Sequence, residues 1–231
     1  MIDRGWSIKS LHRLILLSST YQQSTAPHHE TSARDPENRL FGRANVRRLE
    51  AEEVRDALLA ASGQLDRALG GSLLQVKNRG YLFDHTSKDQ TDYTSRRRSL
   101  YLPVIRNNVY DVFQLLDFPD PAITSGDRST TTVAPQALLM LNSDLVMQSA
   151  ADFAEAILDA PGTDNERLQR IYAIAYGRPA SANEVAANTA FLAAADRSLA
   201  RAVVDPSQRR QQAWSILCQT ILASNEFVYV Q

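Results

Sequence analysis

Two capping boxes near the end of the chain constrain its fold more than any other feature of the sequence. Thr163 is followed by Glu166, and Ser181 by Glu184, so each pair can satisfy two backbone amides that the start of a helix leaves unbonded. Apolar residues repeat at helical spacing from the first box to Gly177, and a glycine readily ends a helix. The two boxes therefore predict an αα-hairpin near the C-terminus.

Further helices are predicted from the spacing of apolar residues and from residues that favour helix starts. Their ranges are 8–21, 49–63, 109–116, 135–141, the segment that Asp144 would cap, and the segment that begins at Asp205 and Pro206. Residues 98–105 (RSLYLPVI) alternate loosely and predict a short edge strand, because Pro103 cannot donate a ladder hydrogen bond. Polar stretches without periodicity lie between these segments, and the longest covers residues 70–98.

The expected fold class is therefore mainly α. We expect an irregular helical domain with an αα-hairpin near the C-terminus, long polar loops and at most one short β element. One domain is expected to cover residues 1–231, since 231 residues can bury a sizeable core.

The composition is that of a folded globular protein, with 44% hydrophobic and 22% charged residues. Cys218 is the only cysteine, which excludes an intrachain disulfide, a cysteine-based zinc site and a c-type haem attachment. We interpret it as a core side chain, and Trp6 and Trp214 as core anchors. No apolar stretch is long enough to span a membrane, and we expect no export signal in residues 1–20.

The net charge of −1 conceals an uneven distribution. Residues 1–110 carry 17 basic and 12 acidic side chains, and residues 111–231 carry 8 and 14, which gives +5 and −6. We expect the two halves to attract each other within one fold; the alternative is a basic half that faces phosphates, acidic sugars or an acidic partner. Because the pI of about 6.4 lacks the basic footprint of a nucleic-acid-binding domain, no nucleic acid is expected as a partner.

The longest polar stretch carries the best candidate for a ligand-facing surface. Basic and aromatic side chains alternate there, and guanidinium groups bind acidic groups while aromatic rings stack on sugars or bases. The candidate ligand-binding residues are Arg96, Arg97, Arg98, Tyr81, Tyr93, Asp84 and His85. The alternative is a solvated loop whose aromatic rings pack back onto the core.

Catalytic and metal chemistry is only weakly indicated. Residues 28–30 (HHE) are adjacent metal-capable side chains in a loop, with no third ligand at a suitable spacing, so we expect no metal and no cofactor. Asp84 and His85 could form an acid–base pair, with Asp117 as a further carboxylate. No catalytic residue can be assigned from the pattern, since neither a nucleophile elbow nor a phosphate-binding loop is present.

Six segments of the chain together resemble one known family. They are GWSIKSLHRLILLSSTYQQS (5–24), DPENRLFGRANVRRLEAEEVRDALLAASGQLD (35–66), RRSLYLPVIRN (97–107), LLDFPDP (115–121), TTTVAPQALLMLNSDLVMQSA (130–150) and LCQTILASNEFVYV (217–230). In this order they are similar to the planctomycete-type C-terminal PSD domain, domain-of-unknown-function family 1553. The resemblance covers nearly the whole chain.

This resemblance implies a context and no mechanism, because the family has no established activity or catalytic residues to carry over. Related domains usually lie at the C-terminal end of large exported proteins, often with a cytochrome-c-like domain and sometimes with carbohydrate-binding modules. The resemblance thus implies an exported or cell-envelope location and other domains of the same protein as partners. This chain has no haem motif and begins close to Gly5, so we expect a family member that lacks its N-terminal part.

These observations lead to two functional hypotheses. The first is a non-catalytic accessory or interaction domain of an exported multidomain protein, linked to cytochrome-c-like or carbohydrate-binding modules, whose loops bind a partner domain or an acidic or sugar ligand. The second is a hydrolase that acts on complex polysaccharide through loop carboxylates and a histidine.

Overall fold

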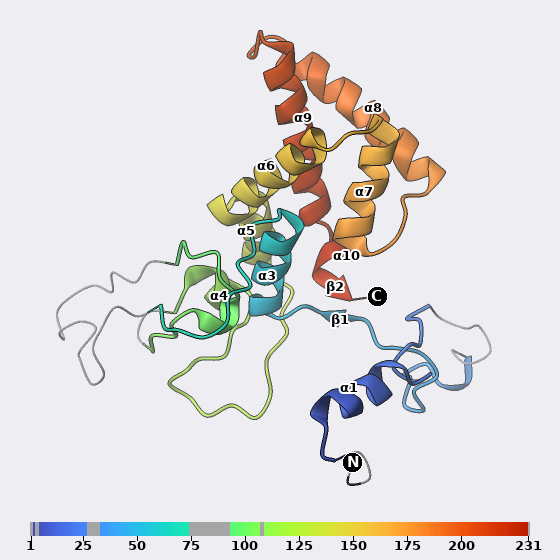
Figure 1. The fold of residues 1–231 in the computed structure, drawn as a ribbon, viewed down its shortest axis with the longest axis vertical. Helices are drawn as coiled ribbons and strands as arrows, with labels where there is room; N and C mark the ends of the chain where they lie inside the picture. Colours follow the sequence, from blue (N-terminus) through green and yellow to red (C-terminus); the bar gives the residue numbers. More distant parts are fainter. Residues whose placement is uncertain (1, 3–4, 27–32, 74–92, 107–108, 231) are drawn as a thin grey trace, which may run out of the picture. The chain divides into compact units, whose positions relative to one another are not determined.

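The computed structural model describes residues 2, 5–26, 33–73, 93–106 and 109–230 (Figure 1). The chain divides into two compact units: unit 1 is Met1–Arg48 with Tyr229–Gln231, and unit 2 is Leu49–Val228. One domain over residues 1–231 stays a prediction.

Unit 1 contains helix α1 (Ile8–Leu16). Its N-cap is Ser7, whose side chain accepts a hydrogen bond from the backbone of Ser10 over 3.2 Å. The helix ends before the predicted residue 21. The Ser18 hydroxyl donates to the carbonyl oxygen of Ile15, an acceptor that a continuing helix would use for a backbone N–H. The prediction of Trp6 as a core anchor is wrong: the side chain is 65% exposed, and the adjoining helix α1 contains no buried residue.

The β structure of the described chain differs from the prediction. Strands β1 (Arg47–Arg48) and β2 (Tyr229–Val230) pair antiparallel in unit 1. The prediction of an edge strand at residues 98–105 is wrong, because this segment contains the short 3₁₀ turn η2 (Ser99–Tyr101). The physical reason is Asp56, whose Oδ1 accepts both the backbone N–H of Ser99, over 2.8 Å, and its hydroxyl, over 2.7 Å.

Unit 2 is helical, and its elements are coloured from teal to red in Figure 1. They are α3 (Ala51–Ala61), α4 (Asp111–Leu115), α5 (Ala134–Asn142), α6 (Asp144–Asp159), α7 (Asp164–Tyr176), α8 (Ala182–Leu199), α9 (Pro206–Leu222) and α10 (Asn225–Val228). The predicted helices are present, with small differences at their ends. Ser143, and not Asp144, caps α6, because its side chain accepts the backbone N–H of Val146.

Both capping boxes form as predicted. The carboxylate of Glu166 accepts the backbone N–H of Thr163, and that of Glu184 accepts the backbone N–H of Ser181, each over 2.7 Å. Gly177 ends α7 in the left-handed conformation, with φ at 70°. The αα-hairpin is therefore α7 and α8, and the mainly α fold class is confirmed.

The core of unit 2 forms where α6 packs along α9, with α3 on one side and α7 and α8 on the other (Figure 1). Its largest fully buried apolar side chains include Trp214, Phe153, Leu58, Leu168 and Leu217. Cys218 is also fully buried, as predicted. None of the helices in the described part of the chain has both the length and the apolarity needed to cross a bilayer.

Candidate ligand-binding site

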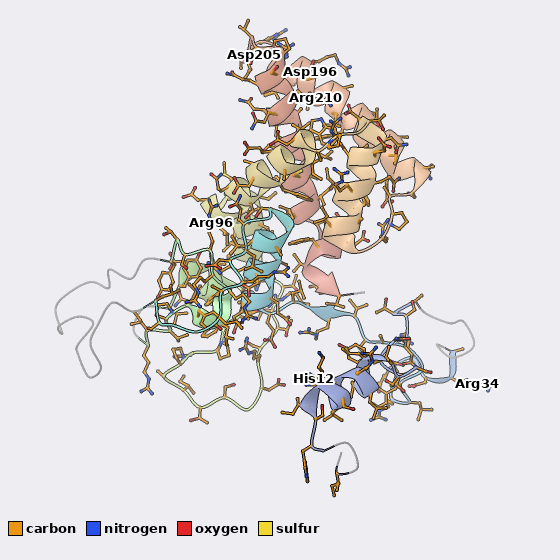
Figure 2. All side chains as sticks on the ribbon, viewed as in Figure 1. His12, Arg34, Arg96, Asp196, Asp205 and Arg210 are labelled. Carbon is orange, nitrogen blue, oxygen red and sulfur yellow. The ribbon has the colours of Figure 1, made fainter. Side chains whose placement is uncertain are left out.

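A cavity of about 370 Å³ lies in unit 2 between the end of α3, the loop before η2 and the N-terminal half of α6. Figure 2 shows Arg96 beside α6, on the loop that borders this cavity. The side chains that determine its chemistry are Arg55, Gln64, Tyr93, Arg96, Tyr110, Asp144, Gln148 and Asp152. Its volume falls within the range that small-molecule sites occupy.

One wall of the cavity is aromatic. The rings of Tyr93 and Tyr110 stack with centroids 4.6 Å apart and planes inclined by 15°. Tyr110 in turn packs edge-to-face with Phe113, with ring centroids 5.3 Å apart, and Phe113 is a buried residue of α4. Burial raises the pKa of Tyr110, and the nearby Arg55 guanidinium opposes this change. The aromatic wall is thus held in place by core packing.

Polar side chains from two elements border the same cavity. Gln148 donates to Oδ1 of Asp152 over 2.7 Å, one helical turn further along α6. Nη2 of Arg96 lies 4.0 Å from Oδ2 of Asp152, and Nη1 of Arg96 donates to Gln64. The Arg96 side chain is 54% exposed, so its guanidinium also meets solvent.

Arg55 lines the cavity from α3 and is the most deeply buried cation of the described chain, with 1% of its surface exposed. Its Nη1 donates to the carbonyl oxygen of Arg97 over 2.9 Å and to the Ser99 hydroxyl over 3.2 Å, and its Nη2 donates to the carbonyl oxygen of Ser95. Its Nε is buried and has no partner among the described residues. Burial lowers the pKa of Arg55, but an arginine stays protonated at neutral pH.

The predicted arginine run divides between two environments. Arg96 lines the cavity together with Tyr93. Arg97 and Arg98 instead lie against the ring of Tyr101, with guanidinium carbons 4.0 Å and 5.5 Å from its centroid. Arg97 also donates to the carbonyl oxygens of residues 68 and 70, so it ties two loops together. The structure therefore places only the first arginine of the run at the cavity.

Tyr81, Asp84 and His85 lie outside the described residues, as do residues 28–30. Asp117, the further carboxylate of the hydrolase hypothesis, accepts hydrogen bonds from the backbone and hydroxyl of Thr131 and from Gln136, and thereby holds the loop after α4. Among the described residues, no group of three or more His, Cys, Asp or Glu side chains could hold a metal ion.

Two further hollows of unit 2 have charged groups that pair with one another. The hollow of about 290 Å³ between α7, α8 and α9 contains Arg210, which bonds Asp164 over 2.5 Å (Figure 2 labels Arg210). In the hollow of about 510 Å³ beside the loop after α4, both Nη atoms of Arg128 donate to the carboxylate of Glu52. Neither hollow combines a stacked aromatic wall with a buried cation.

Arg55 is not among the residues that the sequence predicted for a ligand-binding site. One signal could have identified it: Arg55 is followed by Leu58 three residues later and Leu59 four residues later, so it lies on the buried face of α3. Gln148 and Asp152 carried no comparable signal, because alternating polar residues on a helix are typical of a solvated face.

Comparison with known proteins identifies a family for this chain. No curated protein sequence and no solved structure is significantly similar to the chain. The model of the family described as PSD1, protein of unknown function (DUF1553), matches residues 1–192. The segment at residues 217–230, which also resembles the family, lies beyond that match. Since the match spans most of the chain, including every residue that lines the cavity, the chain belongs to the PSD1 family (DUF1553).

Proposed function

We propose that the chain is a non-catalytic accessory domain that binds a saccharide in the cavity beside α6. One observation carries the proposal: stacked Tyr93 and Tyr110 line the same cavity of about 370 Å³ as the polar side chains of Arg96, Gln148 and Asp152. A sugar ring offers an apolar face to an aromatic side chain and hydroxyl groups to planar polar side chains. A small-molecule site of this kind needs an apolar lining with a few fixed polar groups.

The polar groups are held ready for a ligand. Gln148 and Asp152 belong to one helix of the core, and Tyr110 is braced by the buried Phe113. Side chains fixed by packing lose little conformational freedom on binding, which favours affinity. A cavity on helices of the core therefore suits a binding domain better than a surface formed by polar loops alone.

The hydrolase alternative finds less support in the described residues. The cavity is lined by two carboxylates, Asp144 and Asp152, which are eight residues apart on α6. This separation corresponds to about 12 Å along a helix axis. Glycosidases hold their carboxyl pair about 5–9.5 Å apart. Asp117 accepts a hydrogen bond from Thr131 in the loop after α4 and does not line this cavity.

The wider setting of the domain is part of the proposal. Family resemblance favours a place in an exported multidomain protein, beside cytochrome-c-like or carbohydrate-binding modules. In such a protein a saccharide-binding accessory domain would keep the other domains near a polysaccharide.

Binding of the intact protein to a glycan array, followed by calorimetric titration of the glycans that bind, tests the proposal. We expect Arg96→Ala to weaken binding at least about tenfold, because it removes a charge-assisted hydrogen-bond donor. Arg201→Ala is the matched control, since Arg201 is exposed and lies on the turn after α8, away from the cavity residues. Absence of any bound glycan, or equal binding by both variants, would contradict the proposal.

A reducing-end assay on the same glycans separates the two hypotheses. A binding domain releases no new reducing ends during prolonged incubation. Release that Asp152→Asn abolishes would instead establish the hydrolase alternative.

A further inference from the structure

We propose that the saccharide bound in this cavity carries a carboxylate, as a uronic acid does, that Arg96 binds this carboxylate, and that the buried charge of Arg55 favours it. The inference rests on the proposed function and deepens it by naming the class of saccharide. It follows from the charges that line the cavity and from the partners each of them has.

The first step concerns the buried charge of Arg55. Its nearest carboxylate is Asp56, 3.5 Å away, and Oδ1 of Asp56 already accepts two hydrogen bonds from Ser99. Its other acceptors are uncharged: they are the Ser99 hydroxyl and the carbonyl oxygens of Ser95 and Arg97. A buried cation with so little neutralisation favours an anion nearby.

The Nε of Arg55 also lacks a hydrogen-bond partner among the described residues. Arg55 is 1% exposed and lines the cavity. A buried donor that stays unbonded costs stability. This Nε has almost no exposed surface, so Arg55 acts on a ligand in the cavity through its positive charge and not through a direct contact.

Arg96 has a guanidinium that a ligand in the cavity can reach. Its Nη2 is 4.0 Å from Asp152, which is too long for a hydrogen bond, and its side chain is 54% exposed. Asp152 is mostly buried and already accepts a shorter bond from Gln148. The guanidinium of Arg96 therefore keeps donors for a planar acceptor, and a carboxylate can take two of them at once.

The cavity is also lined by two carboxylates, Asp144 and Asp152, but they do not cancel its preference for an anionic ligand. Asp144 lies in the first turn of α6, where the helix dipole stabilises a negative charge. Asp152 has Gln148 as its donor and Arg96 as its nearest cation. The acidic side chains are thus compensated locally, whereas the carboxylate nearest to Arg55, that of Asp56, is 3.5 Å away and also accepts two hydrogen bonds from Ser99.

The test compares two ligands that differ only at their carboxyl groups. Trigalacturonate and its methyl ester share rings and hydroxyl groups, but the ester lacks the negative charges. We expect calorimetric titration of the full chain at fixed ionic strength to give at least about tenfold tighter binding of the acid. Arg96→Gln should weaken binding of the acid more than binding of the ester and so abolish most of this preference, and Arg201→Gln should leave both affinities unchanged.

Other outcomes would overturn either the carboxylate inference or the proposed saccharide binding. Equal affinities for acid and ester overturn the carboxylate inference and leave saccharide binding intact. If neither oligosaccharide binds and no neutral glycan on the array does, the proposed function fails as well. Binding of a peptide rich in Asp and Glu with the same dependence on Arg96, without any saccharide binding, would assign the carboxylate to a protein partner and overturn the saccharide inference.

Discussion

Arg55 on α3 donates a hydrogen bond of 2.9 Å to the carbonyl oxygen of Arg97, 42 residues further along the chain. Its neighbour Asp56 accepts the backbone N–H of Ser99 over 2.8 Å. Two adjacent residues of one helix therefore hold the loop that carries Arg96 to the cavity. The guanidinium of Arg55 therefore lines the cavity and also fixes the loop that forms one side of it.

Replacing Arg55 should destabilise unit 2. Arg55→Met removes the charge and the donors but keeps an unbranched side chain, and it leaves the carbonyl oxygens of Ser95 and Arg97 without their partner. We expect a loss of about 3 kcal/mol in the free energy of unfolding, measured by urea denaturation. Arg201→Met, at an exposed position, should change it by less than about 0.5 kcal/mol. A similar small loss for both variants would show that Arg55 does not anchor the loop.

Local signals in the sequence account for most of the helices. The boxes at Thr163 and Ser181 and the Asp205–Pro206 start each act within one helical turn, so they could be recognised without knowledge of the fold. The turn at residues 99–101 could not, because the acceptor that sets it, Asp56, is 43 residues away. Trp6 was misjudged because burial depends on what packs against a side chain.

The site was predicted only in part for the same reason. Arg96 and Tyr93 were named because arginine and aromatic side chains favour ligand surfaces, and both line the cavity. The run itself could not reveal that its other two members lie against Tyr101. Arg55 belongs to the cavity through long-range packing of α3, and only its position on the apolar face hinted at burial.

The capping box of α7 should contribute measurably to stability. Thr163→Ala removes the hydroxyl that accepts the backbone N–H of Glu166, and we expect a loss of about 1 kcal/mol in the free energy of unfolding. Thr189→Ala is the matched control on α8, where the hydroxyl bonds the carbonyl oxygen of Val185 and alanine is the better helix former. Thermal unfolding of the two variants checks this, and equal melting temperatures would contradict it.

Glu184 should make stability depend on acid pH. Hydrogen bonds from Arg178, and then from Ser181, lower its pKa from 4.5 to about 2. Because the folded pKa is the lower one, the stabilisation is present above about pH 5 and is lost as the pH falls from 4.5 toward 2. Glu184→Gln should therefore lower the melting temperature at pH 6, with the difference from the native protein disappearing near pH 2.

The matched control for this pH series is Glu155→Gln, at an exposed position of α6. Its melting curve should follow that of the native protein at each pH between 6 and 2. A constant difference between Glu184→Gln and the native protein across this range would mean that the ion pair with Arg178 does not stabilise the fold.

Cys218 should be unreactive while the protein is folded. Burial raises the pKa of its thiol from 9.0 to about 12, so at pH 8 the folded protein holds about a thousandfold less thiolate than the unfolded chain. Labelling by a disulfide reagent at pH 8 should be slow in buffer and fast in concentrated guanidinium chloride. The control is Ser198→Cys in a Cys218→Ala background, which places the only thiol at an exposed position of α8. This thiol should react rapidly in the folded protein, and equal rates for the two positions would show that the packing of α6 against α9 opens readily.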